Sequence, residues 1–281
     1  MTDWTETYRG TVPPWQCDVT EHFTIAYYFD RLEEAEASLA DEPGLSDLSR
    51  RPGLVRRMNV RFARELRKGA SFHVESGALG VDDGGVRVGH RFVDSANGEV
   101  VTWFDERWDL SLTTGQRDTI AGRVVEWNGP AAEQRTEPAG PAGFIPSARG
   151  RVKTSDVDIA GNFALGAMVH RFSNASGQFG AAIGMDGEFM HKNRRGFSTF
   201  ELTVRIAGSL PLDAPYLVRT GVAHLGNSSL RMSHRMTDAR SGDVIAVVGQ
   251  FGVNLDLDAR RPARWPEEIR ARAAALMVAS E

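Results

Sequence analysis

The chain contains one unit twice, and this internal repeat restricts its possible folds more than any other feature of the sequence. A shift of 144 residues aligns 60–77 with 204–221 and, without a gap, 85–101 with 229–245. Upstream, after a four-residue length change, Asp18-x-x-x-His22 aligns with Asp158-x-x-x-Asn162. Two such copies predict two similar domains that face each other as the halves of a dimer would. A site between them can therefore differ on its two sides.

The composition is that of a globular protein with room for two domains. Of the 281 residues, 41% are hydrophobic and 25% are charged. The formal net charge of −4 gives no general attraction to nucleic acid. The single cysteine excludes an internal disulfide. Neither a secretory signal nor a run of about 18 apolar residues is visible, so we expect a cytoplasmic protein without nucleic-acid or membrane partners.

Each copy reads as a short extended segment, a long helix and then about four antiparallel strands. In the first copy, apolar residues at helical spacing predict a helix over 23–40, and β-type runs fill 54–112. The second copy repeats this order, with a helix over 163–180 and strands from 198 to 257. The pattern predicts an α+β unit whose sheet wraps its helix.

The predicted domain boundaries follow the same patterns. The first unit covers 1–114 and the second covers 148–260. Prolines and many small residues mark 115–147 as a linker. Residues 261–281 close the chain with a helix that has Pro266 in its first turn.

The stretch WQCDVTEHFTIAYYFDRLEEAE (15–36) resembles the start of a hot-dog-fold thioesterase of the 4-hydroxybenzoyl-CoA thioesterase type. That family's motif is an aspartate, two residues, Gly-His, then often Asn-Asn and an aromatic-rich helix. The resemblance covers both copies in outline and implies a double hot-dog, in which two antiparallel sheets each wrap one long helix. It also implies hydrolysis of acyl-CoA or acyl-carrier-protein thioesters without a cofactor. The chain would act as a monomer that imitates a dimer, or as a homo-oligomer of double hot-dogs.

The resemblance assigns catalysis to Asp18, as nucleophile or general base, and to His22, as an orienting or polarising group. Thioester hydrolysis also needs donors for the carbonyl oxyanion. Backbone N–H groups at the helix start, at Phe23 and Thr24, can supply them. The residues alone allow another interpretation, in which Asp18 caps a turn and His22 is a polar residue at the helix start.

Neither copy carries the whole family motif. Glu21 stands where the family usually has glycine, either as an added acid/base group or as a solvent-facing residue. Asp158 and Asn162 either complete a composite site with the first copy, or Asp158 only caps the second helix. Asparagine cannot exchange a proton as an imidazole can, so we expect the site built on Asp18 and His22 to dominate.

The spacing of the motif separates two enzyme classes. In hot-dog hydratases the histidine follows the aspartate by five residues, whereas here it follows by four. This favours a thioesterase. A hydratase, dehydratase or other lyase acting on an acyl thioester stays an alternative, as does an acyl-thioester-binding protein without catalysis, which the incomplete motifs support.

Basic residues occur at equivalent places in both copies. Arg50 and Arg51 align with Arg194 and Arg195. They are candidates for binding the phosphates of coenzyme A or of a carrier protein. They can equally form a solvated charged face near a strand edge.

The histidines and the cysteine show no metal-ligand spacing. His90 and His234 occupy equivalent positions on apolar strand faces, which favours core histidines. Cys17, beside Asp18, is more typical of a small buried residue than of a nucleophile. We expect no metal.

Overall fold

The computed structural model describes residues 4–279 except 19, 40, 43, 46–47, 49–53, 133–134, 139 and 160. Arg50 and Arg51 therefore lie outside the described residues. The helices and strands are β1 (Thr5–Thr11), η1 (Pro14–Gln16), α1 (Ile25–Leu39), β2 (Val55–Phe62), β3 (Ser71–Asp82), β4 (Gly85–Asp94), β5 (Val100–Asp109), α2 (Thr114–Ala121), β6 (Ile145–Arg151), η2 (Thr154–Asp156), α3 (Leu165–Ala182), α4 (Gly187–Lys192), β7 (Arg195–Ile206), β8 (Pro215–Leu225), β9 (Ser229–Asp238), β10 (Val244–Asp256), β11 (Arg261–Pro262) and α5 (Glu267–Ala274).

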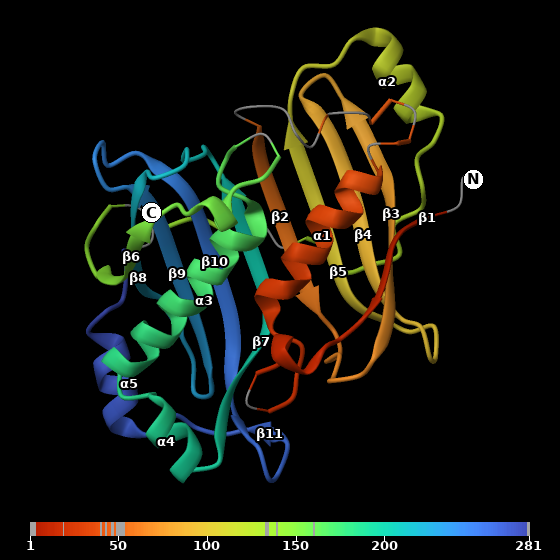
Figure 1. Ribbon diagram of the computed structural model, residues 1–281. Coiled ribbons are helices and arrows are strands. Elements are labelled where there is room, and N and C mark those ends of the chain that lie inside the picture. Colours follow the sequence, from red (N-terminus) through yellow and green to blue (C-terminus); the bar gives the residue numbers. More distant parts are fainter. Residues whose placement is uncertain are drawn as a thin grey trace.

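The strands form one continuous antiparallel sheet that runs through both halves (Figure 1). Its order is β1-β3-β4-β5-β2-β7-β10-β9-β8-β6, with the short β11 added to β10. The second half thus repeats the strand order of the first half in reverse. The two halves join edge to edge through β2 and β7, as the repeat predicts.

The join has the geometry of a two-fold axis. Asn59 on β2 pairs with Thr203 on β7, and these two residues are also equivalent under the 144-residue shift. A residue that pairs with its own counterpart lies on the axis that relates the copies. The expected double hot-dog architecture is therefore confirmed.

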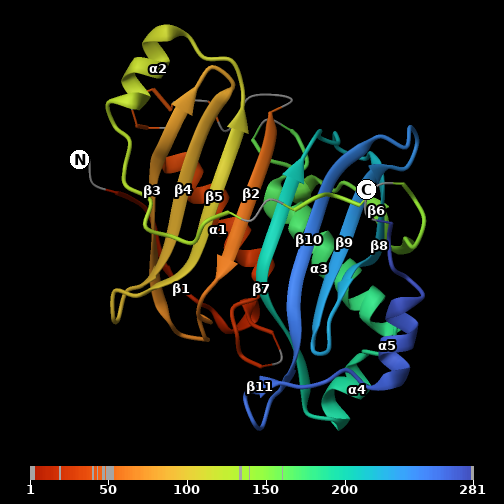
Figure 2. The same ribbon diagram turned by 180° about the vertical axis from the view of Figure 1, so that it is seen from behind.

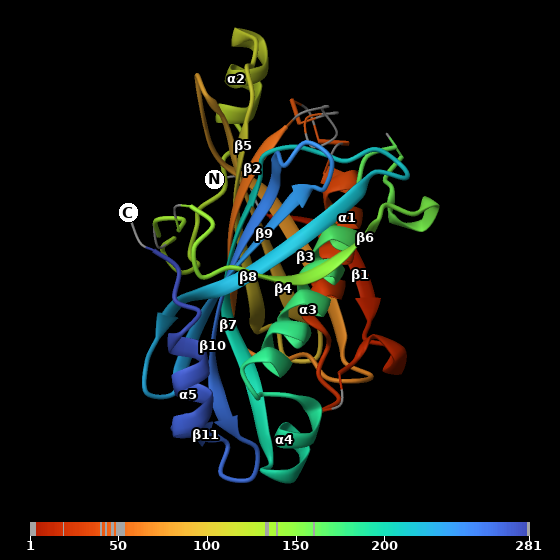
Figure 3. The same ribbon diagram turned by 90° about the vertical axis from the view of Figure 1, so that its left-hand side faces the viewer.

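The long helices α1 and α3 lie side by side and antiparallel on one face of the sheet (Figures 1 and 3). Their apolar stripes bury residues such as Phe29 and Leu32 of α1 and Phe172 of α3 against the sheet. The helices start at opposite ends of the pair. The loops that carry Asp18 and Asp158, each just before a helix, are therefore separated.

The other face of the sheet is crossed by the segment that connects the two halves (Figure 2). We call the described part of this segment, residues 128–132 and 135–138, the outer strap. The predicted linker also contains most of α2, whose N-cap Thr113 forms a capping box with Gln116. At the C-terminal end, β11 precedes a helix that covers only Glu267–Ala274. No described helix is long and apolar enough to cross a membrane.

Candidate functional site

The loop before α1 is held together by the carboxylate of Asp18. Its Oδ1 accepts hydrogen bonds from the Thr20 amide (2.8 Å), the Thr20 hydroxyl (2.6 Å) and the His22 amide (3.1 Å). Oδ2 accepts no hydrogen bond from the described residues, and Asp18 is exposed. One carboxylate oxygen thus builds the loop, and the other is available to solvent or substrate.

His22 lies between a hydroxyl and a second carboxylate. Its Nδ1 is 2.9 Å from Thr20 Oγ1, and its Nε2 is 3.0 Å from Glu65 Oε2. Asp18, Thr20, His22 and Glu65 therefore form a continuous polar chain. The family motif contains neither Thr20 nor Glu65, but Glu65 is the one acid among eight basic residues over 50–68.

Glu21 faces outward and pairs with Lys68. Its backbone has a φ of 63°, and Gly161 at the equivalent position of the second copy has a φ of 80°. The left-handed conformation explains why the family usually places glycine there. The hydrogen bond to Lys68 lowers the pKa of the exposed Glu21 carboxyl. This geometry agrees with the solvent-facing interpretation of Glu21.

The predicted oxyanion donors, the amides of Phe23 and Thr24, are already occupied. The Phe23 amide donates to the carbonyl of Leu66 (2.8 Å) and the Thr24 amide to that of Gln16 (3.0 Å). The expectation is corrected because the chain pairs with neighbouring segments here before the helix begins. The next two amides, of Ile25 and Ala26, donate to no described residue, so the available donors lie in the first turn of α1.

The second copy repeats the loop. The Asn162 amide donates to Asp158 Oδ1 (3.0 Å), and the Asp158 amide donates to the Asn162 carbonyl (2.8 Å). These bonds match those between Asp18 and His22. Loop closure is thus common to both aspartates, whereas the polar chain through Thr20, His22 and Glu65 belongs to the first copy.

The two loops do not form one composite site. Glu33, which follows the start of α1 by eight residues, contacts the first residues of α3. At about 1.5 Å per residue, the starts of the two helices are therefore about 12 Å apart along the helix pair. The loop with Asp158 and Asn162 precedes α3 and lies farther still from the start of α1. The second half contributes a different residue. Arg260, in the turn between β10 and β11, places Nη2 4.0 Å from Glu65 Oε2.

A carboxylate from the first half closes the start of α3. Glu33 Oε1 and Oε2 accept from the amides of Leu165 (2.7 Å) and Gly166 (3.0 Å). Burial raises the pKa of Glu33, and these two amides counteract the rise. The amides equivalent to those of Ile25 and Ala26 are therefore filled from within the chain.

An aspartate and a histidine face each other at the crossing of the two helices. His170 Nε2 lies 3.2 Å from Asp30 Oδ2, and the ring of Tyr27 meets His170 edge-on with centroids 4.8 Å apart. Asp30 and His170 are equivalent under the 140-residue shift that relates the loops. The helix crossing thus lies near the two-fold axis that relates the copies. At this crossing α1 carries an aspartate and α3 carries a histidine.

The basic pair of the second copy is already engaged in ion pairs. Arg194 Nη2 is 3.0 Å from Asp258 Oδ1, and Arg195 pairs with Asp256. Both carboxylates lie at or beyond the end of β10, next to the turn that carries Arg260. Binding of carrier phosphates by Arg194 and Arg195 stays a prediction.

The core of the first half contains a buried charged cluster. Arg56 pairs with Glu36 and Glu106, and His90 Nε2 lies 3.9 Å from Glu106 Oε2. Burial and the Arg56 charge lower the pKa of His90 to about 3. Glu36, His90 and Glu106 are close enough together to hold a metal ion, but the Arg56 guanidinium already supplies the positive charge.

The two strand histidines are core residues, as predicted. His90 Nδ1 is 2.7 Å from Ser76 Oγ, and His234 Nδ1 is 2.8 Å from Thr220 Oγ1. Both side chains are fully buried. Cys17 is half-buried and free, with its thiol 3.6 Å from the Pro13 carbonyl.

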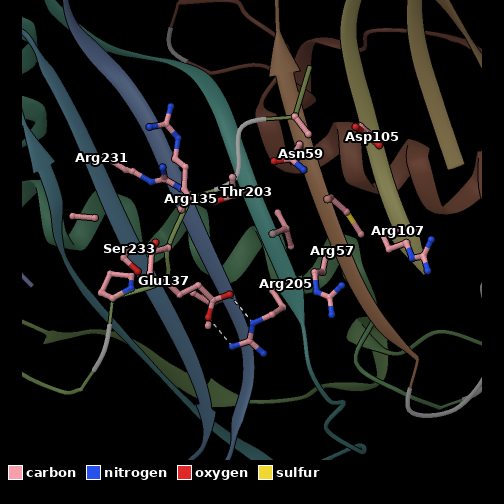
Figure 4. Close-up of a pocket in the computed structure, with 18 of the residues that line it drawn as sticks. Arg57, Asn59, Asp105, Arg107, Arg135, Glu137, Thr203, Arg205, Arg231 and Ser233 are labelled. Atoms are coloured by element: carbon pink, nitrogen blue, oxygen red, sulfur yellow. Dashed lines mark hydrogen bonds and ion pairs between the residues drawn. The ribbon is translucent and has the colours of Figure 1, made fainter. Parts of the chain in front are cut away.

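A cavity of about 500 Å³ lies away from these residues, on the outer face of the sheet beneath the outer strap (Figure 4). Its walls carry several arginines. It does not include Asp18 or His22, so the polar chain before α1 and this cavity are separate features.

Comparisons with known proteins agree with the fold. The model of the thioesterase-like superfamily matches residues 12–127 and 152–273, one segment in each half. No curated protein sequence matches the chain at a significant level.

Two solved structures illustrate the structural similarity. An acyl-ACP thioesterase from Bacteroides thetaiotaomicron is 11% identical, with a TM-score of 0.65 over 87% of this chain and 96% of that one. A 12:0-ACP thioesterase from Umbellularia californica is 13% identical, with a TM-score of 0.61 over 88% of this chain and 93% of that one. At these identities the similarity establishes the fold alone. Because the family model matches both halves and most of the chain, the protein belongs to the thioesterase-like superfamily.

Proposed function

We propose that the protein hydrolyses an acyl thioester of coenzyme A or of an acyl carrier protein, at one site at the start of α1. The observation that carries this proposal is the polar chain Asp18–Thr20–His22–Glu65 at the start of α1, where the amides of Ile25 and Ala26 donate to no described residue. Carboxylate, imidazole and oxyanion donors are the groups that acyl transfer to water requires.

In this mechanism Asp18 acts as the general base. Its Oδ1 is engaged in the loop, so Oδ2 is the oxygen that takes a proton from the attacking water. The water oxygen bonds to the carbonyl carbon, and the C–S bond breaks. The carboxylic acid and the thiol leave, with the proton ending on the sulfur.

The other groups position and stabilise the reacting atoms. The amides of Ile25 and Ala26, at the positive end of α1, donate to the oxyanion. Thr20 hydrogen-bonds the His22 ring at Nδ1, and the Glu65 carboxylate lies beside its Nε2, so the ring sits between the two groups. Arg260, Arg194 and Arg195 give this end positive groups for the carrier phosphates.

The charge distribution favours this end over the start of α3. There, Glu33 fills the equivalent amides, and a carboxylate beside a developing oxyanion would raise the barrier. Asn162 replaces His22 as well. We therefore expect one working site in each chain.

The test is hydrolysis of a panel of acyl-CoAs, followed by release of free thiol. Asp18→Asn should lower kcat by a factor of about 10² to 10⁴. Asp158→Asn is the matched control, because Asp158 makes the same loop bonds in the second copy, and it should change kcat only a few-fold. Full activity of a folded Asp18→Asn variant would rule out its role.

The same panel separates the alternatives. A change in enoyl-thioester absorbance without thiol release would identify a hydratase. Saturable binding of acyl-CoA with neither signal would identify a binding protein. Both outcomes would overturn the hydrolysis proposal.

A further inference from the structure

The outer-face cavity has the size and the composition of a small-molecule site. Its volume of about 500 Å³ falls within the range of about 300–1,000 Å³ that is usual for such sites. Its base is the β2–β7 join, and the outer strap forms its roof. It lies across the sheet from α1 and α3, so no step of thioester hydrolysis uses it.

Three arginines lie side by side at one end of this cavity. In the strand register, Arg57 on β2 lies directly opposite Arg107 on β5 and directly opposite Arg205 on β7. Figure 4 shows the three on neighbouring strands. Like charges at directly opposed strand positions destabilise a sheet. We call these residues the arginine row. Two carboxylates partly balance the row. Asp109 pairs with Arg57 and lies 3.5 Å from Arg107, and Asp82 accepts hydrogen bonds from both terminal nitrogens of Arg107.

The equivalent positions in the other half show that the fold does not require this row. Under the 144-residue shift, Arg107, Arg57 and Arg205 correspond to Phe251, Glu201 and Arg61. There, Glu201 lies 3.0 Å from Arg61 and balances it. The row of three adjacent arginines is therefore a property of one end of the cavity.

A carboxylate from the outer strap indicates what the row can bind. Glu137 accepts from Arg205 Nε (2.6 Å) and Nη2 (2.8 Å), which is a bidentate pair (Figure 4). The two side chains are 40% and 31% exposed, so a ligand can reach the pair from the cavity. A ligand carboxylate or phosphate offers Arg205 the same two-point hydrogen bonding and can therefore compete with Glu137 for it.

Apolar side chains lie beside the arginine row. The side chain of Val247 borders the cavity on the sheet side, and Pro138 borders it on the strap side. Met58 and Val204 also line it, but their side chains are buried in the core on the helix face of the sheet. A ligand that fits would combine an anionic group with a compact apolar or aromatic part.

We propose that this cavity binds an organic anion, whose carboxylate or phosphate group replaces Glu137 on Arg205 and also reaches the neighbouring Arg57. Two sources share this chemistry: a free carboxylic acid and a phosphate ester. The proposal goes beyond the hydrolysis site and does not depend on it.

Isothermal titration of the full-length chain tests the proposal with defined probes. Octanoate represents the carboxylic acid, adenosine 3′,5′-bisphosphate represents the phosphate ester, and inorganic phosphate and octanol are the controls. We expect saturable binding of octanoate or of the bisphosphate, and weaker binding of both controls. Absence of binding by both organic anions at millimolar concentration would overturn the proposal, as would equal affinity for inorganic phosphate.

Variants with opposite expected effects locate the site. Arg57→Gln should weaken binding by about 10- to 100-fold, because a hydrogen bond to a charged group is lost, and Arg57→Lys should weaken it less. Glu137→Gln should tighten binding, because it removes the competing carboxylate. The control is Arg151→Gln, which should not change the affinity. Arg151 is an exposed arginine at the end of β6 that pairs with Asp213, and it does not line the cavity.

The variants also exclude a purely structural role for the cluster. Thermal unfolding verifies that each variant is folded. If Glu137→Gln weakens binding as much as Arg57→Gln does, Glu137 is part of the binding structure, and the replacement proposal is wrong. Unchanged affinity in Arg57→Gln and Arg57→Lys would place the anion elsewhere.

Discussion

Asp18 and Asp158 close the same backbone loop in the two halves, but the helices that follow them have different surroundings. The first two amides of α1 donate to no described residue, whereas those of α3 are held by Glu33. His22 is held by Glu65 and Thr20; its counterpart is Asn162. The duplicated backbone is thus retained at both ends, and the groups suited to catalysis are concentrated at one.

The interiors differ in the same way. Glu36, Arg56 and Glu106 form a buried charged cluster in the first half. Their counterparts Ser176, Phe200 and Gln250 are uncharged, and Phe200 is exposed at an irregularity of β7. Both halves keep the histidine and its hydroxyl partner. The comparison separates what the fold requires, which recurs, from what one half has added. Five predictions test this separation.

The largest expected effect comes from His22→Asn, which gives the first loop the residue of the second. Loss of the imidazole between Thr20 and Glu65 should lower kcat by about 10² to 10⁴. The reciprocal Asn162→His should give no gain, because Glu33 still fills the α3 amides. Steady-state kinetics on both folded variants measures these changes in kcat. A greater loss of kcat in Asp158→Asn than in His22→Asn would assign the catalytic site to the second half.

Arg56→Met tests the buried charged cluster. It leaves Glu36 and Glu106 without their cation, and breaking a buried pair from one side costs about 3–5 kcal/mol of unfolding free energy. The triple variant Glu36→Ser/Arg56→Phe/Glu106→Gln installs the residues of the second half and should lose clearly less. Urea denaturation measures both, and an equal loss would mean that the charges themselves stabilise this half.

His234→Gln tests the histidine that has an uncharged environment. Burial lowers the pKa of His234 to about 4, from an ordinary value of 6.5. Between these values the unfolded chain binds a proton that the folded chain does not bind. The unfolding free energy therefore falls as pH falls from 6.5 towards 4, by up to about 1.4 kcal/mol per pH unit, and stays independent of this group above 6.5.

The variant should flatten that acid-side slope by about one proton. Denaturation curves at pH 5 and pH 7 give the slope for both proteins. The same slope in both would show that His234 is protonated, or exchanges its proton, in the folded state.

Glu33→Ser gives α1 the residue that α3 carries at Ser173. It removes the carboxylate that caps Leu165 and Gly166 and should lower the unfolding free energy by about 1 kcal/mol. Ser173→Ala is the control and should cost less. Thermal unfolding compares them, and an unchanged midpoint for Glu33→Ser would show that water replaces the cap without loss.

The smallest effects are expected at the rim of the proposed site. Charge reversal at Arg194 and Arg195, or at Arg50 and Arg51, should raise the KM for acyl-CoA a few-fold at low salt, with little change in kcat. An acyl-pantetheine without the nucleotide phosphates is the control substrate. Equal changes for both substrates would show that these arginines do not contact phosphate.

Several features follow from the sequence because their signals are local or periodic. The repeat and the helical spacing of apolar residues give the two halves and their long helices. The alternation of His90 and His234 with apolar neighbours places both in the core. The resemblance of residues 15–36 to the hot-dog thioesterases leads to the family.

Tertiary structure alone decides which groups of the site are available. The imidazole of His22 contacts the carboxylate of Glu65, which follows the end of β2. The amide of Leu165 donates to Glu33, which is 132 residues away in the chain. The amides of Phe23 and Thr24 are occupied because Leu66 and Gln16 come to lie beside them. A hydrogen bond depends on distances of a few tenths of an ångström between segments, and the order of residues along the chain does not encode these distances.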